Sequence, residues 1–180
     1  MVCAQEAYWQ LGLDRVVLMP VGEASHRTID RDPGRERRYE LCVAAAEGTD
    51  WLSVSRAEVD RDGPSYTVDT LAELRAQEPS AEFDFVLGAD QALRLPDWHQ
   101  PERVLELARL AVADRDGAAV DGVRAAVAAV GGEGRMTTFS MPRMDVSSTE
   151  VRERVAAGRP YRFLVPERVA GAIEREGLYR

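Results

Sequence analysis

Strand-like and helix-like segments alternate along all 180 residues of the chain. Short apolar runs are each followed by a longer run with helical spacing, and Gly or Pro stands at most boundaries. The expected helices span residues 4–11, 35–47, 67–77, 101–108, 121–130, 148–157 and 166–176, and the expected strands span residues 15–19, 51–55, 82–87, 110–113 and 136–139. Strands joined through helices pair in parallel, so the alternation predicts one three-layer α/β domain over residues 1–180, with a mostly parallel sheet and helices on both faces.

Four segments follow the carboxyl ends of expected strands. They are residues 20–27, 88–90 and 114–117, together with the helix that starts near Ser147. Ligands of parallel α/β sheets bind beyond the carboxyl ends of the strands. We therefore expect these segments to meet at one rim of the sheet and to form the binding site.

The strongest local signal is residues 146–152, with the sequence Val-Ser-Ser-Thr-Glu-Val-Arg. Ser147 is a suitable helix N-cap, and Glu150 three residues later completes a Ser-x-x-Glu capping box. A helix N-terminus carries free N–H groups and a partial positive charge, so Thr149 and Arg152 beside it predict an anion site without a metal. The alternative is a cap that binds no ligand.

Charge argues against one large class of partner. The formal net charge is -8 and the isoelectric point is near 4.9, whereas binding to a nucleic-acid backbone requires concentrated Lys and Arg. Basic residues gather at positions 31–38, but acids are interspersed, and this segment is expected to be a solvated helix start.

Cysteine content and hydropathy indicate a cytoplasmic protein. Cys3 and Cys42 are expected to be reduced thiols, and no Cys or His spacing indicates a zinc site. The chain has no apolar run of about 18 residues and no recognisable signal peptide, so we expect no membrane partner.

Several motifs in order resemble the bacterial nicotinate-nucleotide adenylyltransferases. The matching segments are Gly12-Leu13-Asp14-Arg15-Val16, Pro64-Ser65-Tyr66-Thr67-Val68-Asp69-Thr70-Leu71, Leu87-Gly88-Ala89-Asp90, Leu95-Pro96-Asp97-Trp98, residues 146–152 and Gly177-Leu178-Tyr179. The resemblance implies a Rossmann-like nucleotidyltransferase fold. It also implies transfer of the AMP part of ATP to nicotinate mononucleotide, which gives deamido-NAD and pyrophosphate.

The resemblance assigns the ATP site to two segments. Gly88 and Asp90 match the segment that approaches the ribose, where a carboxylate accepts hydroxyl hydrogen bonds. Ser147, Thr149 and Arg152 match the phosphate-binding segment. Mg²⁺ is expected to arrive with the ATP phosphates, because the sequence has no clustered carboxylate ligands.

The resemblance assigns the mononucleotide site to other residues. Trp98 matches the aromatic residue that stacks on the nicotinate ring, with His99 beside it, and Tyr66 and Thr67 match the segment that receives the nicotinate carboxylate. The implied substrate-binding residues are Tyr66, Thr67, Trp98, His99, Arg115, His26 and Arg27.

One segment of the family has no match in this chain. The family begins with a strand and a Gly-Gly-Thr-Phe-Asp-Pro-x-His-x-Gly-His sequence, whereas the only histidines here are His26 and His99. We therefore expect an amino-terminally shortened member without the first, central strand, whose loss exposes apolar faces of neighbouring elements. No catalytic residue is assigned, and we predict little or no adenylyltransferase activity for these 180 residues alone.

Two alternatives remain at this stage. The chain is a nucleotide-binding or regulatory protein without catalytic activity, or it is a related adenylyltransferase for another phosphate acceptor, such as phosphopantetheine. Trp98 and the Ser65-Tyr66-Thr67 segment favour nicotinate over that acceptor. No sequence feature indicates an oligomeric state.

Overall fold

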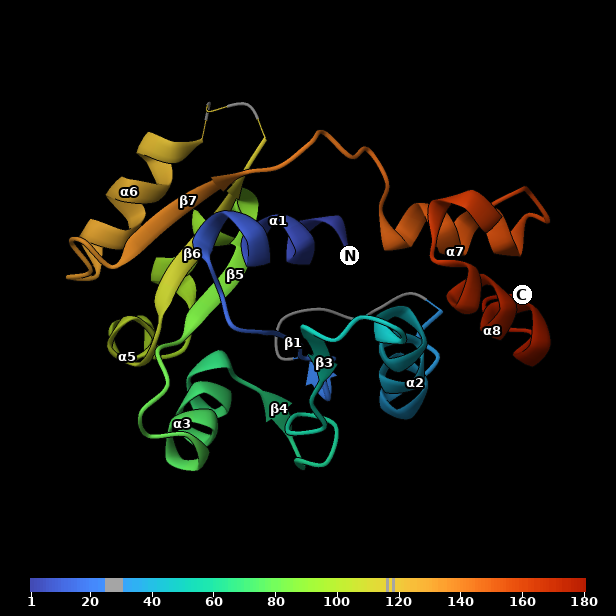
Figure 1. Cartoon of the computed structure of the whole chain (residues 1–180), viewed down its shortest axis with the longest axis horizontal. Helices are drawn as coiled ribbons and strands as arrows, with labels where there is room; N and C mark the ends of the chain where they lie inside the picture. The colour runs from blue at the N-terminus through green and yellow to red at the C-terminus, as the bar shows by residue number, and fades with distance from the viewer. Residues whose placement is uncertain (25–30, 116, 118) are drawn as a thin grey trace. The chain divides into compact units, whose positions relative to one another are not determined.

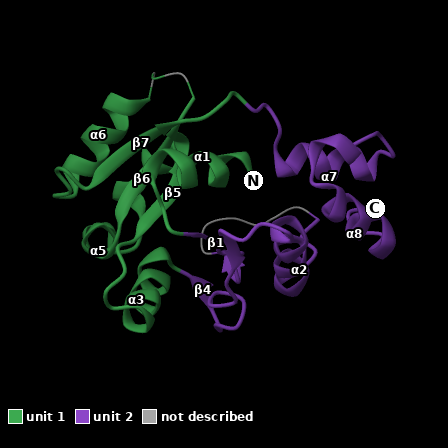
Figure 2. Ribbon diagram, in the orientation of Figure 1, with its two compact units in different colours: residues 1–14, 66–143 green, residues 15–65, 144–180 purple. Residues whose placement is uncertain are grey.

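The computed structural model describes residues 1–24, 31–115, 117 and 119–180. They form two compact units (Figure 2). Unit 1 contains residues 1–14 and 66–143, and unit 2 contains residues 15–65 and 144–180. Both units have parallel strands with helices, which confirms the predicted α/β class. One cooperative domain over residues 1–180 stays a prediction.

Unit 1 is built on a three-stranded parallel sheet in the order β5-β6-β7. The strands are β5 (Asp84–Gly88), β6 (Arg109–Asp114) and β7 (Met136–Ser140). Gly88 pairs with Ala113, and Asp114 pairs with Ser140, so the three strands end at the same edge of the sheet.

The side chains of the central strand β6 alternate between two apolar layers, as expected for a strand that is buried on both faces. Leu110 and Val112 pack in the first layer, whereas Ala111 and Ala113 pack in the second. Helices α4 (Ala89–Ala92), α5 (Pro101–Leu107) and α6 (Val120–Ala129) and the 3₁₀ turn η1 (Leu95–Asp97) contribute to the first layer. Helix α1 (Val2–Leu11) covers the other face, opposite α6 (Figure 1). Unit 1 is therefore a three-layer sandwich.

Two further contacts fix helices to this sheet. Helix α3 (Thr67–Gln77) packs through Val68 and Leu71 against α5. The side-chain amide of Gln10 in α1 accepts a hydrogen bond from the N–H of Ser140 at 2.9 Å and donates one to its carbonyl at 2.8 Å. The end of β7 is thereby paired by a side chain.

Unit 2 has shorter strands and more helix. Strand β1 (Val16–Leu18) pairs in parallel with β3 (Leu52–Val54), and β2 (Glu23–Ala24) pairs in parallel with β4 (Pro64–Ser65). Its helices are α2 (Arg35–Ala46), α7 (Ser148–Ala156) and α8 (Glu167–Glu176), with the 3₁₀ turn η2 (Arg162–Leu164). Val151, Val155 and Ile173 form the apolar centre of this unit, and Leu41 of α2 packs against it.

The expected elements are confirmed, with ends that differ by at most two residues. Helix α3 has the predicted bounds, and the left-handed Gly12 ends α1 as expected. The sequence reading missed β2, β4 and the short helix α4, because elements of two to four residues carry no usable periodicity. The charged segment at 31–38 does start helix α2, but Arg38 in it is 16 % exposed and not solvated as predicted.

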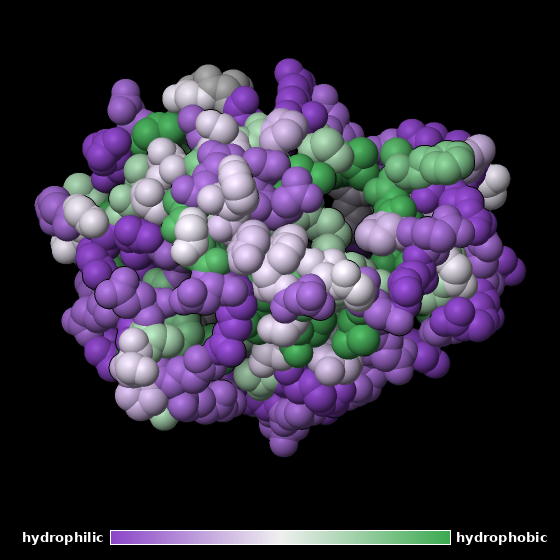
Figure 3. All heavy atoms as spheres, in the orientation of Figure 1, coloured by the Kyte–Doolittle hydropathy of each residue, from purple (hydrophilic) through white to green (hydrophobic). Residues whose placement is uncertain are grey.

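Polar residues dominate the molecular face shown in Figure 3, and apolar residues appear there in separate patches. In the described part of the chain, no helix is long and apolar enough to cross a membrane.

Candidate functional site

The segment after β5 places the Asp90 carboxylate close to the backbone of Gly88. Gly88 ends β5 and is the N-cap of α4, and Asp90 is exposed in the first turn of that helix. A Cβ atom on Gly88 would lie 2.6 Å from Oδ1 of Asp90. Glycine therefore lets this carboxylate fold back over the strand end, where it also accepts a hydrogen bond from Gln91 at 3.2 Å. The exposed oxygens can accept hydrogen bonds from a diol.

The next loop at the same edge carries Arg115. Asp114 ends β6, and its side chain accepts a hydrogen bond from the N–H of Gly117 at 2.7 Å. Gly117 has a φ of 76°, in the left-handed region that glycine favours. This turn leaves the Arg115 side chain exposed beyond the carboxyl end of the strand.

Three predicted substrate residues gather in unit 1. The rings of Tyr66 and His99 lie 4.6 Å apart with a tilt of 40°. Trp98 contacts Phe85 edge-on, with ring centroids 5.8 Å apart, and packs against the first apolar layer while it remains partly exposed. Gln100 follows with a φ of 52°, an uncommon value for a residue other than glycine. The core thus holds one side of the Trp98 ring, and the ring remains partly exposed to solvent.

Helix α3 begins beside these rings. Its N-cap is Tyr66, which makes no side-chain capping hydrogen bond, and Thr67 is the first helical residue. The first N–H groups of a helix have no partner within the helix. The start of α3 therefore offers backbone donors and the Thr67 hydroxyl to a carboxylate.

Unit 2 contains the predicted anion site at the start of α7. Ser147 caps the helix, because its Oγ accepts a hydrogen bond from the N–H of Glu150 at 3.1 Å. The Glu150 carboxylate instead accepts hydrogen bonds from Arg154 at 2.7 and 3.0 Å, so the reciprocal half of the predicted capping box is wrong. Arg152 donates to the Thr149 hydroxyl at 3.3 Å and has no carboxylate at ion-pair distance among the described residues.

The structure groups the predicted residues within each unit. Unit 1 brings Tyr66, Trp98 and His99 together, and it carries Gly88, Asp90 and Arg115 at one strand edge. Unit 2 brings Ser147, Thr149 and Arg152 together. His26 and Arg27 lie outside the described residues.

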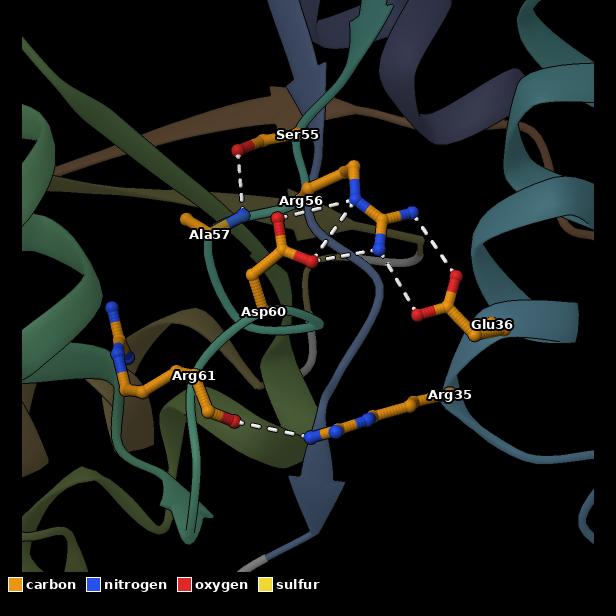
Figure 4. A network of polar contacts seen from close by, with 7 residues as sticks. All are labelled: Arg35, Glu36, Ser55, Arg56, Ala57, Asp60 and Arg61. Atoms are coloured by element: carbon orange, nitrogen blue, oxygen red, sulfur yellow. Dashed lines mark hydrogen bonds and ion pairs between the residues drawn. The ribbon is translucent and has the colours of Figure 1, made fainter.

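Sequence reasoning missed two arginines that organise unit 2. Arg56 donates to Glu36 at 3.0 and 3.1 Å and to Asp60 at 2.7 Å, which ties the segment after β3 to helix α2 (Figure 4). The hydrogen bonds with Arg56 lower the pKa of both carboxyl groups. The guanidinium also lies 4.7 Å from the centre of the Tyr39 ring.

The second of these arginines is Arg38. Its guanidinium donates to the carbonyl of Val21 at 2.8 and 3.1 Å and to that of Gly22 at 2.6 Å, and it also pairs with Asp32. An arginine among interspersed acids carries no sequence signal that distinguishes this position from its exposed neighbours.

The described residues contain no group of three or more His, Cys, Asp or Glu side chains that could hold a metal ion. Cys3 and Cys42 are free and partly buried, and burial raises the pKa of each thiol. Neither thiol has the lowered pKa of a reactive cysteine.

Comparison with known proteins identifies the family of this chain. The model of the cytidylyltransferase-like family matches residues 1–154. A probable nicotinate-nucleotide adenylyltransferase of Saccharopolyspora erythraea is 37% identical over 100% of this chain and 82% of its own length. The corresponding protein of Streptomyces coelicolor is 36% identical over 100% of this chain and 93% of the relative's own length. The corresponding protein of Roseiflexus is 39% identical over 98% of this chain and 88% of the relative's own length.

A solved structure shows the same fold. The Plasmodium falciparum nicotinic acid mononucleotide adenylyltransferase complexed with NaAD has a TM-score of 0.72 and 12% identity, with 99% of this chain and 88% of that chain covered. Full-length identity with the bacterial proteins, together with this fold, confirms the resemblance seen in the sequence. The chain belongs to the nicotinate-nucleotide adenylyltransferase family, whose members are transferase enzymes, within the cytidylyltransferase-like proteins.

Proposed function

We propose that this protein transfers the adenylyl group of ATP to nicotinate mononucleotide, a step of NAD biosynthesis. The observation that carries the proposal is the 37% identity over the whole chain with a probable nicotinate-nucleotide adenylyltransferase. Two candidate ligand surfaces support it. One is the aromatic group of Tyr66, Trp98 and His99, and the other is the start of α7 with Arg152. Free cysteines fit a cytoplasmic enzyme.

In this reaction an oxygen of the mononucleotide phosphate attacks the α-phosphorus of ATP. The new bond joins the two phosphates, the bond from the α-phosphorus to its bridging oxygen breaks, and pyrophosphate leaves with the electron pair. The protein supplies positioning and charge stabilisation, and no covalent enzyme intermediate is needed. Mg²⁺ bound to the ATP phosphates would supply further positive charge.

Separate residues serve the two parts of ATP. Asp90, folded over Gly88, accepts hydrogen bonds from the ribose hydroxyls. The start of α7 binds phosphate through its free N–H groups, the Thr149 hydroxyl and the Arg152 guanidinium, with Ser147 fixing the helix start.

The acceptor is recognised through its ring, its carboxylate and its phosphate. Trp98 and the Tyr66–His99 pair offer aromatic surface to the pyridine, and Thr67 with the start of α3 receives the carboxylate. Arg115 binds the mononucleotide phosphate. The family resemblance adds His26 and Arg27 to the substrate-binding residues, and both lie outside the described residues. A carboxylate site favours nicotinate over acceptors such as phosphopantetheine.

A second function has one observation in its favour. The 180 residues contain two histidines, and neither belongs to a His-x-Gly-His sequence that would stabilise charge on the transferring phosphate. The second function is that of a nucleotide-binding or regulatory protein, which would bind ATP at the start of α7 without turnover.

The first experiment separates binding from turnover. Calorimetry with ATP measures the Kd, and pyrophosphate release is followed with ATP and nicotinate mononucleotide. We expect Arg152→Gln to weaken ATP binding about tenfold, the effect of losing a charge-assisted contact, whereas Arg175→Gln on the exposed face of α8 keeps the original Kd. ATP binding without pyrophosphate release would select the second function, and an unchanged Kd in Arg152→Gln would remove the phosphate site.

Acceptor selectivity is tested at the start of α3. We expect Thr67→Val to reduce use of nicotinate mononucleotide about tenfold and to leave use of nicotinamide mononucleotide unchanged, because only the former carries a carboxylate. Equal use of both acceptors by the unaltered protein would refute carboxylate recognition at Thr67.

A further inference from the structure

The side chain of Glu150 is turned away from the start of its own helix. Glu150 lies in the first turn of α7, and its backbone N–H donates to Oγ of the N-cap Ser147 at 3.1 Å. In a complete capping box the Glu side chain reaches back to the backbone N–H of the N-cap residue. Here Oε1 of Glu150 instead accepts hydrogen bonds from Arg154 at 2.7 and 3.0 Å. The Ser147 N–H therefore lacks the acceptor that the sequence motif would supply.

Arg154 is held on two sides. Its Nε and Nη2 donate to Glu150 one turn earlier on the same helix face, and its Nη1 donates to the carbonyl of Pro160 at 3.1 Å. The Arg154 and Glu150 side chains are 32% and 34% exposed, whereas residues 147–149 are classed as exposed. A fixed and partly buried guanidinium thus holds the carboxylate toward the second turn of α7.

Three backbone donors at the start of α7 have no acceptor among the described residues. They are the N–H groups of Ser147, Ser148 and Thr149. The Arg152 guanidinium lies in the following turn and donates to the Thr149 hydroxyl at 3.3 Å. The start of α7 therefore presents free donors, and the acidic side chain of its first turn is neutralised by Arg154.

An unpaired Glu150 would oppose ATP binding in two ways. Its carboxylate would accept the hydrogen bond of the Ser147 N–H, and its charge would lie at the helix end that attracts the phosphates. A phosphate would then have to displace a carboxylate from the same donors. Arg152 is not expected to capture Glu150, because residues two apart on a helix do not face each other.

We propose that Arg154 is a positioning residue that holds the Glu150 carboxylate away from the Ser147 N–H and thereby keeps the start of α7 open to the phosphates of ATP. This proposal rests on the proposed function of α7. Its chemistry is competition between a carboxylate and a phosphate for the same donors, so the effect of removing Arg154 depends on the presence of Glu150.

The first test measures the Kd of ATP by calorimetry on the full chain. We expect Arg154→Met to weaken ATP binding about threefold to tenfold, the effect of one competing hydrogen bond. The double variant Arg154→Met/Glu150→Ala should regain the original Kd within about twofold, because no carboxylate remains to compete. Both variants lose the contact with Pro160, so both should melt below the original chain while only one binds ATP less tightly.

A second measurement follows the Ser147 N–H itself without ATP. Its exchange with water, observed by NMR, should slow about threefold or more in Arg154→Met, because the freed carboxylate accepts its hydrogen bond. The exchange rate should return to the original value in the double variant. A general attraction between the Arg154 charge and ATP would leave this rate unchanged in every variant.

Two controls separate position from charge. Arg159→Met removes one positive charge just beyond the end of α7, at a side chain without an ion pair among the described residues, and should leave the Kd unchanged. Arg154→Lys keeps a cation one turn after Glu150, and we expect a Kd within about twofold of the original.

The outcomes are distinct. If Arg152→Gln binds ATP as the original chain does, the phosphate site and this inference both fail. If Arg152→Gln weakens binding but Arg154→Met does not, or the double variant stays weak, or the Ser147 N–H exchanges at the original rate in Arg154→Met, the inference alone fails.

Should Arg154→Met not fold, Glu150→Ala carries the test. This variant breaks the same ion pair but also removes the competing carboxylate. A Kd that is equal or tighter supports the inference. A weaker Kd overturns it, because an ion pair with a purely structural role is lost with either partner.

Discussion

Different interactions stabilise the interior of each of the two units. Unit 1 places apolar side chains on both faces of a sheet, with Leu110 and Val112 on one side and Ala111 and Ala113 on the other. Unit 2 has ladders of two and three residue pairs, and its connections are fastened by the guanidinium groups of Arg38 and Arg56. Unit 1 has apolar layers on both faces of one sheet, whereas unit 2 combines the apolar cluster around Val151 and Ile173 with these polar contacts.

This difference suits the ligands proposed for each unit. A flat pyridine ring requires an aromatic surface that the core holds still, and Trp98 has one edge against Phe85. Phosphates require hydrogen-bond donors that remain hydrated until binding, and the Thr149 hydroxyl is exposed at the helix start. The core of unit 1 thus supports the aromatic surface proposed for the acceptor, and the proposed phosphate site in unit 2 is an exposed helix start.

The largest expected effect is at the centre of unit 1. Leu110 is fully buried, so Leu110→Ala should lower the free energy of unfolding by about 2–5 kcal/mol. Hydrogen exchange followed residue by residue should show the loss of protection in β5, β6 and β7. The control Leu93→Ala, at a side chain that is 44% exposed, should change little. Equal loss of protection in both units would break the contrast and support one cooperative domain.

A smaller change in stability is expected in unit 2, where Gly22 lies close to the backbone of Glu58. A Cβ atom on Gly22 would lie 1.9 Å from the carbonyl oxygen of Glu58, so Gly22→Ala should destabilise the protein by about 1–3 kcal/mol. Gly171→Ala in α8 meets no atom within 4 Å and should stabilise it by about 0.5–1 kcal/mol. Thermal melting checks both, and a Gly22→Ala variant as stable as the original chain would contradict the close approach at Gly22.

The smallest expected effect concerns Arg56. Its hydrogen bonds lower the pKa of Glu36 and Asp60 in the folded state, so their contribution is present at neutral pH and is lost as pH falls through the folded values. The melting temperature of Arg56→Met should be slightly below that of the original chain at pH 7, and the gap should close below about pH 4. A gap that widens on acidification would refute this role of Arg56, and Arg175→Met serves as the control.

Sequence reasoning was most accurate where one local rule governs an element. Helix α3 has its predicted bounds, and the Ser147 cap forms as expected. It was least accurate where two local rules compete. The Glu150 carboxylate could accept a hydrogen bond either from the backbone N–H of the N-cap or from Arg154 one turn later. It accepts the hydrogen bond from the charged Arg154.

The sequence by itself determined the order of strands and helices, the α/β class and the family, because periodicity, terminators and ordered motifs are properties of the chain. Only the tertiary structure decided the β2–β4 pairing, the close approach of Gly22 to the carbonyl of Glu58 and the burial of Arg38. These features depend on which distant backbone or charge comes within a few ångströms of a residue, and spacing along the chain does not encode that contact. The physical reason is that hydrogen bonds and close packing act over short distances in space, whatever the separation in sequence.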